Sequence, residues 1–195
     1  MYRKQMVSLF ILGAIFSLGI KQALAIPLID STVHIYSQTL SFKTPVGWIP
    51  GSRVDSGSVF RLELIPPNEK IESWNSMLTV SGYRGLAGRM SSRQAYEVEA
   101  QSVIQACPGN SINQVVNPPG RKDDSVFALV GCKKHPSIPN KNEVAFYAFI
   151  RGKDDIYMIK KSFRELINST GTRLNESSYS ELAPEVLAVE LSPAG

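Results

Sequence analysis

The sequence predicts an α+β fold in which helices pack on an antiparallel sheet. Several short segments alternate apolar and polar residues, which is typical of strands with one buried face. Helical spacing is clearest in a single segment near the middle of the chain, so the regular strand–helix alternation of a parallel α/β fold is not seen. Two apolar segments late in the chain, joined by a short loop that contains Gly152, predict a β-hairpin.

The first predicted strand lies within residues 32–42, where apolar and polar side chains largely alternate, with an interruption near Ser37. Pro45 and Gly47 follow and predict a tight turn. The turn carries Trp48, which we expect to be a core anchor rather than a binding platform.

Two more strands are expected at residues 58–65 and 77–83. In the first, apolar residues alternate with Arg61 and Glu63, and Pro66 stops the strand. The second leads into the Gly-rich stretch 82–88.

The predicted helix begins at Ser91, which forms a capping-box pattern with Gln94. Apolar residues then recur at helical spacing: Tyr96, Ala100, Val103, Ile104 and Cys107. Pro108 and Gly109 end the helix.

The second half of the chain predicts three strands and a short helix. Residues 126–132 form an apolar run, and residues 143–150 and 156–163 form the hairpin. Residues 168–180 are polar, and residues 181–191 can form a closing helix with Pro184 in its first turn.

Residues 1–25 have the pattern of a secretory signal peptide. Arg3 and Lys4 precede an apolar run over residues 6–20, and the sequence Ala23-Leu24-Ala25 predicts cleavage between Ala25 and Ile26. The run is about 15 residues, short of the roughly 20 that a bilayer-spanning helix needs.

The expected mature chain is a single α+β domain over residues 26–195, with a polar carboxyl-terminal segment from about residue 168. No second apolar run is long enough to span a bilayer, so we expect no stable membrane span after cleavage. The alternative is that the leader is retained as an amino-terminal anchor. In either case the protein is expected to be exported, either to a periplasm or to the outside of the cell.

Export makes the two cysteines informative, because an oxidising compartment lets Cys107 and Cys132 form a disulfide. On the chain-entropy estimate the bridge would contribute roughly 3 to 4 kcal/mol. The alternative, a redox pair or a reactive thiol, usually shows a much closer spacing such as C-x-x-C.

The formal charge of +4 argues little for nucleic-acid binding. Three basic residues and no acidic residue lie in the first 25 positions, so the mature chain has a net charge of about +1. We therefore expect no nucleic-acid partner.

The segment Phe42-x-x-Pro45-x-Gly47-Trp48 follows the opening strand and is followed by further strands, a helix and a late hairpin. In this order of elements the chain resembles the α-β-α sandwich of PsbP, Mog1 and DcrB. The resemblance implies that fold, and it is typical of exported bacterial proteins. It implies no active site.

The sequence shows no catalytic, cofactor or metal motif, so no residue is predicted to hold a cofactor or metal. His34 and His135 lie far apart and outside zinc-binding patterns, and nucleophile-elbow and phosphate-loop motifs are missing. Asp55–Ser58 is expected to be a turn rather than a reactive-serine cluster.

Tyr83, Arg84 and Arg89 are the candidate partner contacts, because aromatic and Arg side chains in a Gly-rich stretch suit a protein interface. The alternative is an ordinary loop whose side chains anchor it.

These observations favour a non-enzymatic binding or accessory protein of the cell envelope or the secreted fraction. Two alternatives stay open. A small secreted or periplasmic hydrolase would gather His34 or His135 with a carboxylate and a hydroxyl, whereas a small-ligand carrier would have one large apolar pocket.

Overall fold

The computed structural model describes residues 27–107, 109, 111–116, 118, 120–133, 141–166 and 183–193. The elements in chain order are β1 (Leu28–Ile35), β2 (Gln38–Pro45), β3 (Ile49–Asp55), β4 (Val59–Ile65), β5 (Ser76–Tyr83), α1 (Ser92–Ala106), β6 (Ser111–Val116), β7 (Ser125–Cys132), β8 (Lys141–Arg151), β9 (Ile156–Leu166), α3 (Pro184–Leu187) and β10 (Glu190–Pro193).

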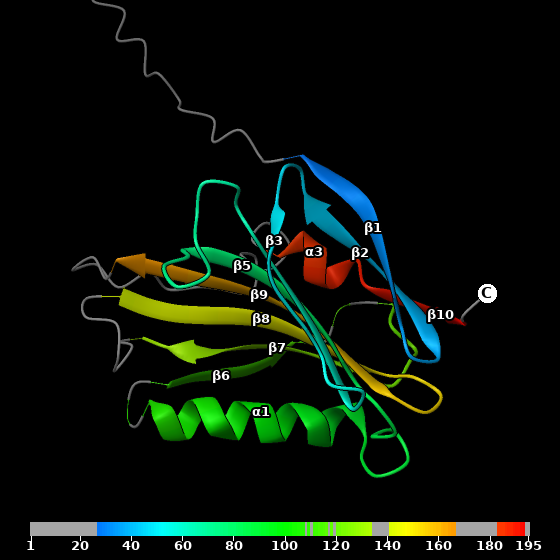
Figure 1. The fold of residues 1–195 in the computed structure, drawn as a ribbon. Coiled ribbons are helices and arrows are strands. Elements are labelled where there is room, and N and C mark those ends of the chain that lie inside the picture. The colour runs from blue at the N-terminus through cyan, green and yellow to red at the C-terminus, as the bar shows by residue number, and fades with distance from the viewer. Residues whose placement is uncertain are drawn as a thin grey trace, which may run out of the picture.

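These elements stack as layers around a large central sheet (Figure 1). The seven strands of the central sheet have the order β3-β4-β5-β9-β8-β7-β6, and a smaller sheet has the order β1-β2-β10. Every strand pair in both sheets is antiparallel. The predicted α+β class with an antiparallel sheet is therefore confirmed.

The first face of the large sheet is covered by the small sheet and α3. Alternate side chains of the central strands point into this layer, as the two-residue period of a strand requires. They form the larger apolar core with residues of the small sheet and α3: Ile35, Leu40, Phe42, Leu78, Val80, Phe127, Leu129, Phe146, Ile159 and Val186.

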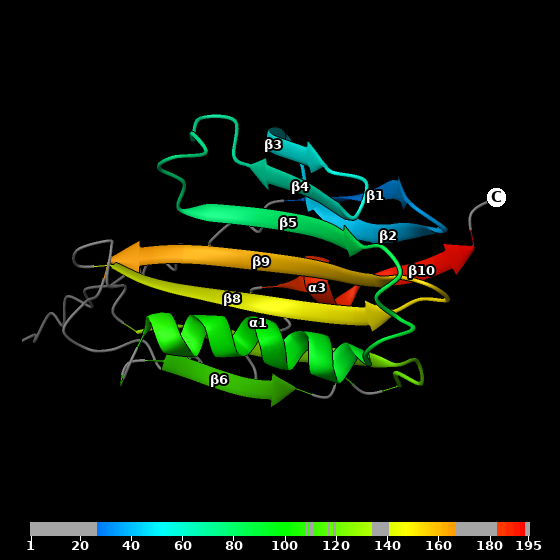
Figure 2. The same cartoon turned by 60° about the horizontal axis from the view of Figure 1, so that its bottom comes forward.

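The second face of the large sheet is covered by α1 over part of its width. The helix packs on β6, β7 and β8, and its buried Tyr96 and Ala100 contact alternate residues of those strands. Figure 2 shows α1 in front of β7 and β8, while β9 and β5 lie beside it without a helix in front of them.

The helix starts as the sequence predicts. The Ser91 hydroxyl accepts a hydrogen bond from the backbone N–H of Gln94, and the Gln94 side chain accepts one from the backbone N–H of Ser91. This capping box satisfies two N–H groups that the first turn leaves without helical partners.

The disulfide between Cys107 and Cys132 joins the end of α1 to the end of β7, with Cα atoms 5.7 Å apart. Both cysteines are buried. The predicted pairing is confirmed, and it fixes the helix to the sheet at the carboxyl end of α1.

A buried ion pair holds α3 against the large sheet. Lys161 Nζ of β9 donates to Glu185 Oε1 of α3 at 2.7 Å, and the two side chains are 4% and 5% exposed. Lys161 Nζ also lies 3.9 Å from the ring centroid of Trp48. Burial lowers the pKa of Lys161, while the Glu185 carboxylate opposes this shift.

The small sheet packs tightly against the large one at Gly82 of β5. A Cβ atom built there would lie 2.5 Å from Ile35 Cγ2. Glycine is therefore required at this position by close packing rather than by a backbone angle.

Four parts of the fold differ from the sequence predictions. The first predicted strand, over residues 32–42, is a hairpin of β1 and β2 that turns at Tyr36 and Ser37, where an interruption was expected. β3 and β6 were not expected, because both are edge strands with weak alternation, and β3 contains Pro50 and Gly51. The predicted helix over 181–191 is limited to α3, and the chain continues as β10, which pairs with β2.

Several expectations lie outside the described residues. These are the signal peptide, its cleavage site between Ala25 and Ile26, and the polar segment from about residue 168 to 182. Within the ranges that are described, no helix has the length and apolar character that crossing a bilayer requires.

Candidate binding surface

The part of the second face that α1 leaves uncovered is polar. The strand register places Glu63, Thr79, Lys160 and Tyr147 side by side across β4, β5, β9 and β8. We call this surface the open sheet face, and it consists of Arg61, Glu63, Thr79, Ser81, Tyr83, Met158, Lys160 and Ser162.

A groove runs between α1 and the helix-facing side of β7 and β8, beside the disulfide. Its volume is about 210 Å³. The residues that line this α1 groove are Ser102, Val103, Ala106, Val130, Gly131, Cys132, Glu143, Ala145 and Tyr147. The groove thus adjoins the open sheet face at Tyr147.

Tyr147 is the buried polar side chain at this boundary. Burial raises the pKa of its phenol well above the ordinary value, and the charges of Glu99 and Glu143 raise it further. Its hydroxyl donates to Glu99 Oε1 at 3.4 Å, and Lys160 Nζ lies 5.5 Å from its ring centroid. Tyr147 therefore stays protonated and acts as a hydrogen-bond donor.

At one end of the open sheet face, Arg164 interacts with two other side chains. Arg164 Nε donates to Glu143 Oε2 at 2.8 Å, and the Arg164 guanidinium lies 3.7 Å from the ring centroid of Trp74. Trp74 is buried, as expected for a core residue. Arg164 is thus held by both a carboxylate and an aromatic ring.

Thr79 is buried in the middle of the open sheet face, between Glu63 and Lys160 in the register. Its hydroxyl makes no hydrogen bond to any residue that the structure describes. A buried hydroxyl without a partner costs about 1–3 kcal/mol, so Thr79 lowers the stability of the fold at this point.

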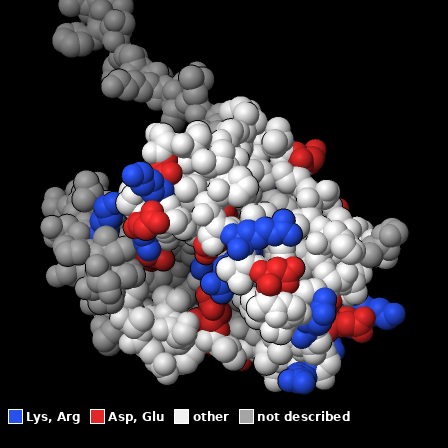
Figure 3. Space-filling model, viewed as in Figure 1, with Lys and Arg blue, Asp and Glu red and all other residues white. Residues whose placement is uncertain are grey.

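The surface carries both signs of charge in close alternation. Arg61 and Lys160 carry positive charge and Glu63, on the same face, carries negative charge. The carboxylate of Glu99 in α1 is near enough to this face to act on Tyr83. In Figure 3 the basic and acidic side chains are interspersed, and neither sign forms a large patch of its own.

The three predicted partner contacts do not lie on one surface. Tyr83 is half-buried on the open sheet face, where burial raises the pKa of its phenol and the charges of Glu99 and Arg61 act on it in opposite directions. The Arg84 guanidinium instead lies 4.4 Å from the ring centroid of Tyr36, which packs against the larger core. Arg89 is exposed in the turn before α1.

Asp155 holds the Gly-rich loop to two other turns. Its buried carboxylate accepts from the backbone N–H of Gly85 at 2.8 Å and from the Ser37 hydroxyl at 2.7 Å, and the Tyr157 hydroxyl lies 3.1 Å from it. Burial alone would raise the pKa of Asp155, but these hydrogen bonds outweigh burial and lower it. The loop that carries Arg84 is therefore anchored.

The hydrolase hypothesis gains no support from the described residues. His34 is exposed on β1, and its Nδ1 lies 3.5 Å from the Thr39 hydroxyl, with which it can form no more than a weak bond. His135 lies outside the described residues. Asp55–Ser58 forms a turn, as predicted, in which Gly57 has a φ of 78°.

The search for metal ligands gives a similar result. In the described ranges, no three His, Cys, Asp or Glu side chains are grouped so that they could hold a metal ion.

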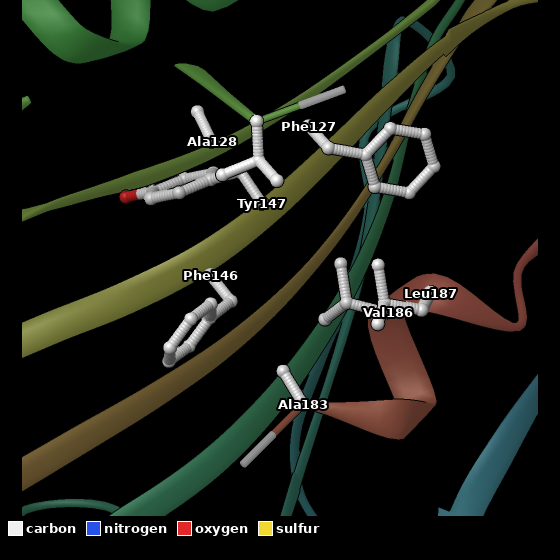
Figure 4. A pocket seen from close by; sticks show the side chains of 8 residues that line it. Phe127, Ala128, Phe146, Tyr147, Ala183, Val186 and Leu187 are labelled. Atoms are coloured by element: carbon white, nitrogen blue, oxygen red, sulfur yellow. The ribbon is translucent and has the colours of Figure 1, made fainter. Parts of the chain in front are cut away.

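The carrier hypothesis was tested on the apolar pocket beside α3, which Figure 4 shows from close by. Phe127 and Phe146 of the sheet line it from one side, and Ala183, Val186 and Leu187 line it from the other. Its volume is about 10 Å³, which is room for about one water molecule. This pocket is too small for a carried ligand.

The sequence held one signal for the open sheet face. Lys160 and Lys161 are adjacent in a strand that is otherwise apolar through residue 159, so their side chains lie on opposite faces of the sheet and each face must accommodate one ammonium group. The positions of Glu63 and Thr79 beside Lys160 depend on pairings between distant strands, which no local pattern reveals.

Comparison with known proteins supports the fold. The Ran-binding protein Mog1p of Saccharomyces cerevisiae is similar over 84% of this chain and 96% of its own, with a TM-score of 0.50 and 14% identity. The solution structure of the PsbP protein (CyanoP) of Synechocystis sp. PCC 6803 covers 93% of this chain and 99% of its own, with a TM-score of 0.48 and 14% identity.

LpqN of Mycobacterium tuberculosis, which is involved in cell envelope biogenesis, covers 85% of this chain and 92% of its own, with a TM-score of 0.40 and 10% identity. No family profile and no curated protein sequence matches this chain. At these identities the likeness concerns the fold alone, and at that level the predicted resemblance to the PsbP and Mog1 group is confirmed.

Proposed function

We propose that this protein is an exported, non-enzymatic accessory protein that binds a protein partner through the open sheet face. The observation that carries the proposal is the partial cover by α1. The helix shields β6, β7 and β8, and beyond it the charged side chains of Arg61, Glu63 and Lys160 reach the surface, while the hydroxyl residues between them are buried.

Alternating charges of this kind favour a protein partner over other ligands. A partner with the complementary pattern would align in one register, whereas a partner with like charges opposite Lys160 or Glu63 would be rejected. The balance of signs argues against a nucleic acid, which needs a basic surface.

The α1 groove supports the same conclusion by its size. At about 210 Å³ it lies below the range of about 300–1,000 Å³ that is usual for small-molecule sites. It suits a single side chain of a partner, with Tyr147 and Glu143 offering polar contacts.

The fold is compatible with such a role, because Mog1p, which shares it, is a Ran-binding protein. Export is supported by the leader-like residues 1–25 and by the disulfide, which an oxidising compartment would maintain. Residues 26–195 would then be the mature protein, in the cell envelope or outside the cell.

Site-specific photo-crosslinking in the native host tests the proposal. A photoreactive amino acid at position 160 should give a discrete adduct with a partner protein. The same amino acid at Thr32, which is exposed on the outer side of the small sheet, should not.

A second variant connects the adduct to the charge pattern. Lys160→Glu should abolish the adduct formed from position 61, while Lys43→Glu on the small sheet should leave it intact. Equal adducts from positions 160 and 32, or an adduct that survives Lys160→Glu, would contradict the proposed surface.

A further inference from the structure

The exposed apolar side chains of the described residues are unevenly distributed. Five large ones are exposed, and three of them lie at one end of the molecule: Ile29 at 51%, Val46 at 46% and Ile49 at 42%. We call these three residues the apolar end. The other two, Val54 and Val98, lie elsewhere on β3 and α1.

The apolar end surrounds the place where the described chain begins. Ile29 pairs with Thr44 in the register of β1 and β2, and the backbone N–H of Val46 donates to the carbonyl of Pro27 at 2.9 Å. Figure 1 shows that the start of β1, the end of β2 and the start of β3 come together there.

The sequence before Pro27 indicates what lies against the apolar end. Residues 6–20 are the most apolar run of the chain, and residues 21–26 connect them to Pro27. Six residues span at most about 20 Å, so whatever receives residues 6–20 is within that distance of the apolar end.

We propose that in the precursor, before cleavage after Ala25, the apolar end rests on the lipid bilayer that residues 6–20 enter, so that the folded chain is held against the membrane at this end. This inference goes beyond the proposed function and uses a different surface. Figure 1 shows α1 on the side of the molecule away from the chain entry. The groove is lined by residues of α1, β7 and β8, so a bilayer at the apolar end leaves it accessible to a partner.

The contact is apolar rather than electrostatic. The chain after residue 25 has a net charge of about +1. Lys43, the cation nearest in register to Ile29, forms an ion pair of 2.5 Å with Asp30. Binding at this end should therefore change little with salt concentration.

Hydrogen exchange of the full chain, with and without vesicles of uncharged phosphatidylcholine, tests the proposal, because these vesicles carry no net charge to attract Arg3, Lys4 and Lys21. We expect the backbone amides of residues 46–49 to exchange at least about five-fold more slowly on vesicles, since the bilayer excludes water from this turn. The effect should be unchanged when the salt concentration is raised.

Two matched double variants make the test specific. Val46→Ser with Ile49→Ser should remove the lipid-dependent protection, and Val54→Ser with Val98→Ser, at residues of similar exposure, should leave it unchanged. All four side chains are exposed, so the variants should fold, and their far-ultraviolet circular dichroism checks this.

Three results would overturn the inference. The first is unchanged exchange at residues 46–49 on vesicles to which residues 1–26 are bound. The second is protection without vesicles that grows with protein concentration, which would assign the apolar end to a second copy of the chain. The third is equal loss of protection in both double variants.

Discussion

The two faces of the large sheet are covered by different elements and to different extents. The first face is covered across its centre by the small sheet and α3, and its one buried ion pair, Lys161–Glu185, lies inside that cover. The second face is covered by α1 over three strands, and its remaining strands carry Glu63, Thr79 and Lys160.

This difference shows that composition along each strand decides how far a layer extends. β8 alternates apolar side chains toward both layers, so both of its faces are buried. β9 turns polar on the α1 side at Lys160 and Ser162, which is where the helix stops covering the sheet. The covered face supplies stability, and the uncovered one is available for binding.

The largest effect is expected at the ion pair of the covered face. Glu185→Ala should lower the free energy of unfolding by about 3–5 kcal/mol, because it leaves the buried Lys161 ammonium without its partner. Urea unfolding measures this loss.

The matched control is on the more open side. Glu143→Ala breaks the pair with Arg164, whose side chains are 28% and 19% exposed, and should cost about 1 kcal/mol. If the two variants were equally destabilised, the distinction between a covered and an uncovered face would be wrong.

The second effect concerns the disulfide that joins the end of α1 to β7. Cys107→Ser with Cys132→Ser should lower the free energy of unfolding by roughly 3 to 4 kcal/mol on the chain-entropy estimate for a loop of 25 residues. The unaltered protein should show no titratable thiol when it is denatured without a reductant. Two titratable thiols would contradict the pairing.

The third effect depends on pH. Hydrogen bonds lower the pKa of Asp155 in the folded protein, so its carboxylate stabilises the fold. This stabilisation is fully present above the unfolded pKa of about 4. It is lost as the pH falls through the lower pKa of the folded protein. Asp155→Asn should cost about 2 kcal/mol at pH 7 and flatten this acid-induced loss. Thermal unfolding from pH 7 to pH 2.5 measures both changes, and an unaltered acid profile in the variant would count against the assignment.

The smallest effect compares two glycines. Gly82→Ala should cost about 1–3 kcal/mol, because its methyl group would collide with Ile35 where the two sheets meet. Gly88→Ala is the control, since a Cβ there meets no atom within 4 Å and should change the stability by about 0.5 kcal/mol or less. Equal costs at both positions would mean that the sheets do not approach each other at Gly82.

The sequence predicted those parts of the fold that are encoded locally. The capping box at Ser91, the hairpin of β8 and β9, and the alternation of β4 and β5 are visible within short windows, and the structure confirms them. The edge strands β3 and β6 were missed because one half-exposed face and few neighbours leave little pattern in the residues.

Most of the candidate site could not be predicted from local sequence patterns. Tyr83 was singled out from composition and lies on the open sheet face, but Arg84 points to Tyr36 on the other side of the same strand end. Neighbouring residues in a strand alternate sides, so a cluster of attractive residue types in sequence is split by the sheet. Whether Tyr83, Arg84 or Arg89 contacts a partner stays a prediction.

The pairing of β10 with β2 sets a condition on how the molecule can be made. Residues 190–193 complete a sheet whose other strands lie within residues 28–45, so the small sheet cannot close until residue 193 has been synthesised. Contacts this distant along the chain slow folding. If the protein is exported as proposed above, this delay would keep the new polypeptide unfolded while it passes through a translocation pore.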